Sequence, residues 1–279
     1  MNPDTSAKPP VVIFAGGLGT RLGGDFSSIP KPLVHVGPFP VLLHIIFSYL
    51  NEGFSRFIVC TGYKSSEFQT YFSTLSLRSP YAGFKISDLG VEQINKSVDF
   101  RDLGALTHPF SVEFVDTGIN TLTGGRLAQI ENLISTDIFL CTYGDGLTNQ
   151  SIHEVINFHK NTGSLATLTA FHPPSRFGEV EIDENGFVIS FQEKPLSKSF
   201  VNGGFFVFSK DVFAHLDKRA SLEEGLLSHL SRMKVLSAFR SEACWQMMDT
   251  PREVNILNEL YYSGKAFWLQ DKHTEGLTN

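Results

Sequence analysis

The chain has 279 residues, enough to bury one large hydrophobic core or two smaller ones. Hydrophobic residues make up 42% of it and charged residues 19%, which is ordinary for a globular protein in water. The formal net charge of −6 argues against a general surface for nucleic acid or anionic membranes, so any functional positive charge must be gathered locally.

The first ten residues, MNPDTSAKPP, are polar and end in two prolines, and we expect residues 1–10 to form a flexible tail. They lack the apolar core of a signal peptide, and no later apolar run reaches the length of a membrane span. Cys60, Cys141 and Cys244 are too widely separated to suggest a metal or disulfide pattern. These features predict a cytoplasmic protein that has neither a membrane nor nucleic acid as a partner.

The apolar, β-branched run from Val11 to Phe14 predicts a buried strand. The chain then turns through AGGLGTR, residues 15–21, where three glycines let the backbone lie against a ligand. Backbone N–H groups that no side chain shields form a concave site for phosphate oxygens. Arg21 and Lys31 add positive charge at the two ends of this loop, one as a planar fork and one as a point charge. The loop is therefore predicted to bind a polyphosphate.

Two better-known glycine-rich loops do not match this stretch. A dinucleotide fingerprint counted from Gly17 and Gly19 needs a third glycine where Leu22 stands, and no acidic residue follows at the distance of a ribose contact. A P-loop ends in Gly-Lys-Ser/Thr, but residues 23–25 read GGD. The structural alternative is a tight turn whose Arg21 is only a solvated surface charge.

Strands and helices alternate after the loop. Pro40 opens a helix over residues 41–50, a buried strand follows at residues 56–63, and a helix spans residues 65–72. This alternation predicts an α/β, Rossmann-like fold with a mostly parallel mixed sheet that helices cover on both faces. From about residue 75 to 110 the pattern breaks, and we expect an insertion with short strands.

Regular elements return after the insertion, within one domain over residues 11–279. Ser151 is expected to cap a helix that leads to Gly163. Asn185 and Gly186 form the predicted turn of a hairpin. The other predicted elements are strands at 111–115, 137–142 and 165–171 and helices at 125–134, from Ser221 and at 252–262. Residues 165–270 therefore combine a β-rich extension with a helical C-terminus.

Two aspartates follow apolar stretches at polar breaks in the chain. Asp145 lies in TYGDG, directly after a predicted strand, and Asp249 lies in MMDTP. Ligands of open α/β sheets bind beyond the carboxyl ends of the strands, and carboxylates are typical ligands of Mg²⁺. The alternative for each residue is a turn or cap aspartate. We predict that both hold Mg²⁺ together with substrate phosphates.

The segment FQEKP follows the predicted hairpin. Because proline disfavours helical backbone in the residue before it, we expect Lys194 to be extended and suited to reach a sugar phosphate. The alternative is an ordinary surface charge.

Several blocks of the sequence, in this order, resemble the sugar-1-phosphate nucleotidylyltransferases, which join a sugar 1-phosphate to a nucleoside triphosphate and release pyrophosphate. The blocks are AGGLGTRL, PKPLV, VDTG, TLTGGRL, TYGDG, FQEKP, NGGFFV and WQMMDTPRE. They span the chain from Val11 to about Leu269 and resemble in particular the cytidylyl-transferring branch. The resemblance implies a GT-A-like architecture, CTP and α-D-glucose 1-phosphate as substrates, Mg²⁺ as cofactor and a homo-oligomer with contacts through the insertion.

The resemblance also implies roles for individual residues, with Arg21 and Lys31 as the catalytic pair. The implied nucleotide-binding residues are Phe14, Ala15, Gly16, Gly17, Leu18, Gly19, Thr20, Arg21, Lys31, Thr121, Arg126, Gly144 and Asp145. The implied sugar-phosphate-binding residues are Glu193, Lys194, Asn202 and Gly203, and the implied metal ligands are Asp145 and Asp249. TGGR at residues 123–126 favours cytosine, because thymidylyl and uridylyl relatives carry other residues there.

One position departs from the family pattern. The family often has a lysine two residues before Lys31, where this chain has Ile29, so less positive charge lies near the triphosphate. A thymidylyl- or uridylyltransferase remains an alternative within the same reaction class. A metal-dependent glycosyltransferase and a non-catalytic sugar-nucleotide-binding subunit are alternatives of other classes.

Overall fold

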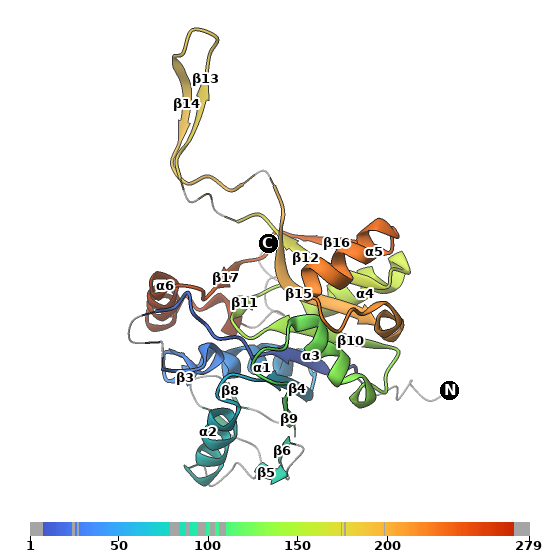
Figure 1. Ribbon diagram of the computed structural model, residues 1–279. Coiled ribbons are helices and arrows are strands. Elements are labelled where there is room, and N and C mark those ends of the chain that lie inside the picture. The colour runs from blue at the N-terminus through green and yellow to red at the C-terminus, as the bar shows by residue number, and fades with distance from the viewer. Residues whose placement is uncertain are drawn as a thin grey trace, which may run out of the picture.

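The computed structural model describes residues 8–23, 26, 28–78, 84–87, 90–93, 99–100, 104–105, 110–173, 175, 177–197 and 199–270. In this part of the chain, a nine-stranded sheet has the order β16-β12-β15-β10-β1-β4-β9-β6-β5 (Figure 1). Seven strands share one direction: β16 (Leu236–Ser241), β12 (Ala166–Phe171), β10 (Ile138–Tyr143), β1 (Val11–Phe14), β4 (Arg56–Thr61), β9 (Ser111–Asp116) and β5 (Phe84–Ser87). Strand β15 (Val201–Ser209) runs antiparallel between β10 and β12. The predicted mostly parallel mixed sheet is confirmed.

Helices cover both faces of the sheet, as the alternation of elements predicted. Along β1, Val11 and Ile13 belong to one hydrophobic cluster, whereas Val12 and Phe14 belong to the other. The first cluster includes residues of α1 (Val41–Asn51), α2 (Ser65–Arg78), α4 (Ile152–Thr162) and α6 (Pro251–Tyr262). The second includes residues of α3 (Thr123–Gln129), the π-helix Leu222–Leu227 and α5 (Ser228–Arg232). The side chains of β1 are buried on both faces of the sheet because a layer of helices covers each face.

Short strands are present in the predicted insertion. Strands β5 (Phe84–Ser87) and β6 (Gly90–Gln93) pair with each other, and β6 extends the sheet by pairing with β9. Strands β7 (Asp99–Phe100) and β8 (Gly104–Ala105) form a separate pair. The rest of residues 79–109 lies outside the described residues.

Residues 8–10 of the expected tail are docked on the body of the protein, while residues 1–7 lie outside the described residues. The carbonyl of Pro10 accepts a hydrogen bond from Leu140 N at 2.9 Å, which continues the pairing of β1 with β10. Lys8 Nζ donates to the carbonyl of Glu52 at 3.2 Å and lies over the ring of Phe54. These contacts tie the chain to the body before β1 begins.

The cap of α4 differs from its prediction. Ser151 stands at the N-cap position, but its side chain accepts no capping hydrogen bond. Glu52, just past the end of α1, accepts from Ile152 N at 2.7 Å and from Ser151 Oγ at 3.2 Å. A buried carboxylate is a stronger acceptor than a hydroxyl and opposes the partial positive charge of the helix N-terminus. Glu52 therefore caps α4 in place of Ser151, although it precedes Ile152 by 100 positions in the sequence.

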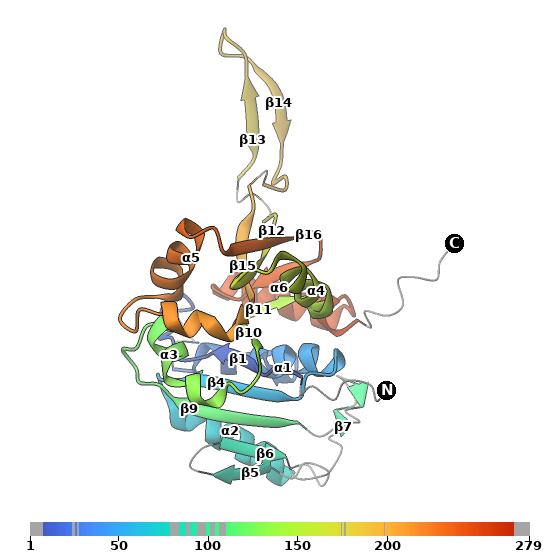
Figure 2. The same cartoon turned by 90° about the vertical axis from the view of Figure 1, so that its right-hand side faces the viewer.

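The predicted hairpin consists of β13 (Glu179–Ile182) and β14 (Val188–Gln192), with Gly186 in the turn at φ +86°. It projects well away from the body (Figures 1 and 2). Its pairing aligns four apolar residues on one face and four polar residues on the other. The apolar residues are Val180, Ile182, Val188 and Phe191, and the polar residues are Glu179, Glu181, Ser190 and Gln192. The apolar side chains are 48–64% exposed.

The remaining elements are short strands and 3₁₀ turns. They are β2 (His35–Val36), β3 (Phe39–Pro40), β11 (Gly146–Thr148), β17 (Trp245–Met247) and the 3₁₀ turns Lys31–Leu33, Glu131–Leu133, Lys210–His215 and Phe267–Leu269. Helix α6 begins with a reciprocal capping box between Thr250 and Glu253. Cys60 and Cys141 are buried free thiols and Cys244 is an exposed one. Among the described residues, no helix has both the length and the apolar character that crossing a membrane requires.

Candidate functional site

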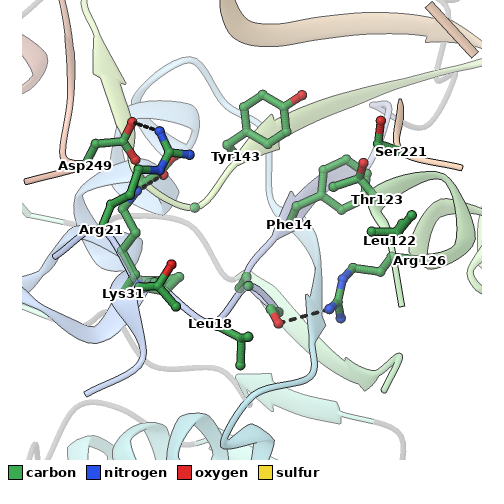
Figure 3. A pocket seen from close by; sticks show the side chains of 18 of the residues that line it. Phe14, Leu18, Arg21, Lys31, Leu122, Thr123, Arg126, Tyr143, Ser221 and Asp249 are labelled. Atoms are coloured by element: carbon green, nitrogen blue, oxygen red, sulfur yellow. Dashed lines mark hydrogen bonds and ion pairs between the residues drawn. The ribbon is translucent and has the colours of Figure 1, made fainter. Parts of the chain in front are cut away.

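The glycine loop that follows β1 lines a cavity of about 560 Å³. This volume is in the range of small-molecule and nucleotide sites. All residues predicted to bind a nucleotide line it, as do Asp249 and several residues outside that predicted set. The additional lining residues are Pro32, Leu122, Thr123, Tyr143, Ser221, Glu223 and Met247. Figure 3 shows the cavity with the loop along its floor.

Arg126 fixes the glycine loop from behind. Its Nη2 donates to the carbonyl of Gly16 at 2.9 Å, and its Nη1 donates to the carbonyl of Thr61 at 2.7 Å and to Thr117 Oγ1 at 2.5 Å. The residue is only 4% exposed. A Cβ on Gly16 would lie 2.0 Å from Nη1 of Arg126, so only glycine fits beneath the guanidinium. Arg126 lines the cavity, but these three hydrogen bonds go to the protein.

A small antiparallel pair of strands brings the two predicted metal ligands together. Strand β11 directly follows Asp145, and β17 ends two residues before Asp249. In their register, Gly146 lies opposite Met247, and Met248 N donates to the carbonyl of Asp145 at 2.9 Å. The two carboxylates therefore meet at one side of the cavity although 104 residues separate them in the sequence.

Both basic residues of the loop contact this acidic pair. The ammonium group of Lys31 forms ion pairs with both Asp145 and Asp249. Arg21 Nη1 contacts Asp249 Oδ2 at 2.9 Å, while its side chain stays 78% exposed (Figure 3). Two charges that flank the loop in sequence thus lie on the same side of the cavity.

The acidic pair fits a divalent cation. Asp145 Oδ1 is buried and has no hydrogen-bond partner among the described residues, which is costly for a carboxylate oxygen unless a ligand reaches it. Burial raises the pKa of Asp145, and the neighbouring Lys31 partly offsets this rise. The described residues hold no cluster of three or more potential metal ligands. Two carboxylates that leave further positions to substrate phosphates and water suit Mg²⁺.

A second hollow of about 530 Å³ adjoins the first, and Tyr143, Met247 and Asp249 line both. Asn202 and Gly203 line it, as predicted sugar-side residues would. Trp245 forms part of its wall: its Nε1 donates to the carbonyl of Gly203 at 3.0 Å.

Glu193 and Lys194 do not line either cavity. Their side chains are exposed and face each other, with Lys194 Nζ 3.4 Å from Glu193 Oε1. The prediction that Lys194 is extended is wrong, since its φ is +47°. This backbone turn leads to Pro195, whose carbonyl accepts from Ser175 N at 2.7 Å and closes the base of the hairpin. A tertiary contact therefore overrides the local preference of a residue before proline.

Comparisons with known proteins agree with this geometry. The profile of the family described as Nucleotidyl transferase matches residues 10–246. The chain is 40% identical over 260 residues to a glucose-1-phosphate cytidylyltransferase of Salmonella typhi, covering 92% of this chain and 97% of that protein. It is 34% identical over 259 residues to a probable glucose-1-phosphate cytidylyltransferase of Bacillus subtilis, covering 92% and 98%. The crystal structure of HddC from Yersinia pseudotuberculosis complexed with GMP-PN has the same fold, with a TM-score of 0.62, 22% identity and coverage of 91% and 99%.

The packing of Arg126 against the loop predicts different effects for two adjacent glycines. Gly16→Ala should lower the free energy of unfolding by about 1–3 kcal/mol, because the added methyl group displaces a buried, triply bonded guanidinium. Gly17→Ala should change it by less than about 0.5 kcal/mol, since a Cβ there meets no atom within 4 Å. Urea unfolding without nucleotide measures both. Equal losses for the two variants would contradict the supporting role of Arg126.

Proposed function

This chain belongs to the nucleotidyl transferase family, and we propose that it transfers the cytidylyl group of CTP to α-D-glucose 1-phosphate, giving CDP-glucose and pyrophosphate. The observation that carries the proposal is the 40% identity to the Salmonella typhi enzyme over nearly the full length of both proteins. The cavity supports it independently, because a glycine loop, two basic residues and two carboxylates meet there.

The reaction needs little covalent participation by the protein. A phosphate oxygen of the sugar 1-phosphate, already anionic at neutral pH, forms a bond to the α-phosphorus of CTP. The bond from that phosphorus to the bridging oxygen breaks, and pyrophosphate leaves in line with the attack. Catalysis then consists of orientation and neutralisation of charge.

The roles of the loop and its charges follow from their positions. The backbone N–H groups of residues 16–20 orient the phosphates, since the N–H of Ala15 already donates to the carbonyl of Cys60. Arg21 is exposed at the cavity. Its planar guanidinium donates paired hydrogen bonds to the leaving phosphates and stabilises the negative charge that accumulates on them. Lys31 neutralises Asp145 and Asp249 and adds positive charge beside the α-phosphate. Both are proposed as the catalytic residues.

Asp145 and Asp249 are the proposed ligands of Mg²⁺, supported by the unpartnered Oδ1 of Asp145. When bound, Mg²⁺ supplies positive charge that offsets the phosphates and fixes their orientation. For the sugar phosphate, Asn202 and Gly203 are proposed at the hexose and Lys194 at the phosphate, with Glu193 beside it. The adjoining hollow supports the first two.

Pyrophosphate release tests the proposed function. With α-D-glucose 1-phosphate and Mg²⁺, CTP should give the highest kcat/KM among CTP, UTP, dTTP and GTP, and mass spectrometry should identify CDP-glucose. Removing Mg²⁺ with EDTA should abolish turnover. A preference for UTP or dTTP would overturn the cytidylyl assignment, and binding of CTP without turnover would favour a non-catalytic binding subunit. Consumption of a nucleotide sugar to glycosylate an acceptor would favour a glycosyltransferase.

The proposed role of Arg21 predicts a specific kinetic pattern. Arg21→Ala should lower kcat by roughly a hundredfold or more with a smaller change in KM for CTP, because its charge acts mainly in the transition state. Arg21→Lys should restore only part of this loss, since a point charge cannot make a bidentate contact. Arg219→Ala is the control, because Arg219 is 95% exposed and does not line the cavity. Near-normal kcat for Arg21→Ala would remove Arg21 from catalysis.

We also propose that the protein is a homo-oligomer, with the apolar face of the β13–β14 hairpin as a contact between copies. Four exposed apolar side chains lie on this face: Val180, Ile182, Val188 and Phe191. Two more exposed apolar residues are close by, Phe187 at the turn and Ile189 at the bulge. Contiguous exposed apolar patches are typical of contact sites between proteins. A second copy offers the same face, so the two can cover each other around a two-fold axis.

Two substitutions at neighbouring positions of β14 test this contact. Phe191→Glu puts a charge on the apolar face and should lower the molar mass measured by light scattering. Ser190→Glu puts the same charge on the polar face and should leave the mass unchanged. A monomeric wild-type protein, or an unchanged mass for Phe191→Glu, would contradict the proposed contact.

A further inference from the structure

The two ends of the cavity differ in chemistry. Arg21, Lys31 and Asp249 lie on one side of it, and Leu122, Thr123 and Ser221 lie on the other (Figure 3). The phosphates of a nucleoside triphosphate belong beside the glycine loop and the basic residues. Its base therefore belongs at the opposite end, where Glu223 also lines the cavity.

Tyr143 connects the middle of the cavity to Glu223. In Figure 3 its hydroxyl points away from the Arg21–Asp249 contact and toward the side of Ser221. The hydroxyl donates a hydrogen bond to Glu223 Oε1. Burial and then the charge of Glu223 raise the pKa of Tyr143 well above its usual range, so the phenol stays protonated and is the donor.

Packing holds Tyr143 in this orientation. Its ring makes an edge contact with Phe206, with centroids 5.8 Å apart. A Cβ on Gly204 would lie 2.4 Å from the ring, and Gly204 also has a φ of +81°, so the position requires glycine. Glu223 is thus held by a fixed donor. A carboxylate has about four acceptor sites on its two oxygens, so one bond from Tyr143 leaves it able to accept another.

Two hydroxyl groups lie beside Glu223. Thr123 Oγ1 accepts from Leu222 N at 2.7 Å, which ties the start of α3 to the start of the π-helix. Ser221 Oγ accepts from Glu224 N at 3.1 Å. Because both oxygens accept from backbone N–H groups, each hydroxyl keeps its own proton as a donor. This end of the cavity therefore offers one charged acceptor and two donors, held together by backbone contacts.

We propose that Glu223 is the residue that selects cytosine, by accepting a hydrogen bond from the exocyclic N4 amino group of the base. Cytosine presents one donor, N4, followed by two acceptors, N3 and O2. The carboxylate matches the donor, and the hydroxyls of Ser221 and Thr123 match the acceptors. This inference rests on the proposed function and adds the group that distinguishes CTP from the other pyrimidine nucleotides.

The same arrangement disfavours uracil and thymine. Both carry the acceptor O4 where cytosine carries its amino group, so O4 would face a carboxylate that cannot donate. Glu223 is exposed in the free protein, so the mismatch acts when a bound base covers its carboxylate: two acceptors then face each other with no proton to share. Selection by Glu223 is therefore expected to act on the ratio of kcat/KM for CTP to kcat/KM for UTP.

Glu223→Gln tests the inference, with Glu224→Gln as its matched control. The glutamine amide can still accept from Tyr143 but presents an N–H donor to the base, which suits O4 of uracil and opposes N4 of cytosine. The CTP/UTP ratio of kcat/KM should fall at least about tenfold for Glu223→Gln, with a higher kcat/KM for UTP. Glu224 loses the same charge one residue away but does not line the cavity, so Glu224→Gln should keep the wild-type ratio.

The outcomes separate this inference from the proposed function. The ratio compares two substrates on one folded enzyme, so a partly unfolded preparation does not change it. If wild-type enzyme prefers CTP and Glu223→Gln keeps the same ratio, Glu223 does not select the base and the proposed function stands. An equal fall in Glu224→Gln would assign the effect to net charge and would also overturn the inference. A wild-type preference for UTP or dTTP would overturn the proposed function itself.

Discussion

The site depends on the ion pairs between Lys31 and two aspartates that come from distant parts of the chain. Asp145 and Asp249 contact the same ammonium group, and without it their carboxylates would repel each other and destabilise this partly buried site. Lys31 removes that cost in the free protein, and its side chain is only 12% exposed. The short β11–β17 pair carries the arrangement, because it fixes the backbone on which both aspartates stand. Loss of that pairing would separate the acidic residues and leave Lys31 without its partners.

A second cationic residue, Arg126, holds the glycine loop in place. Arg126 is buried and bonded to the backbone of Gly16 and Thr61, so it joins the ends of β1 and β4 behind the loop. Burial lowers the pKa of Arg126, yet arginine stays charged far above neutral pH. Its positive charge therefore lies directly behind the start of the glycine loop. One residue thus shapes the loop and contributes to its electrostatic potential.

In the proposed function, the two ends of the cavity recognise different parts of the nucleotide. Charge at the Arg21 end acts on phosphates, which every nucleotide carries, and cannot distinguish one base from another. Selectivity must come from neutral and charged hydrogen-bonding groups at the far end, where Tyr143, Ser221 and Glu223 lie. Tyr143 also lines the adjoining hollow, so its ring forms part of the wall shared by both cavities.

Local sequence patterns predicted the elements that arise from interactions over a few residues. The β-branched run of β1, the glycines after it, the helix after Pro40 and the hairpin turn at Gly186 were all predicted, because propensity and turn chemistry act over a few residues. Motif blocks likewise indicated the residues that line the main cavity. Tertiary packing brought distant groups together: Glu52 at the start of α4, Lys31 between Asp145 and Asp249, and Glu223 beside Tyr143. It also gave Lys194 a positive φ, where the sequence predicted an extended backbone. These contacts follow from strand order and helix packing, which join residues that no local pattern connects.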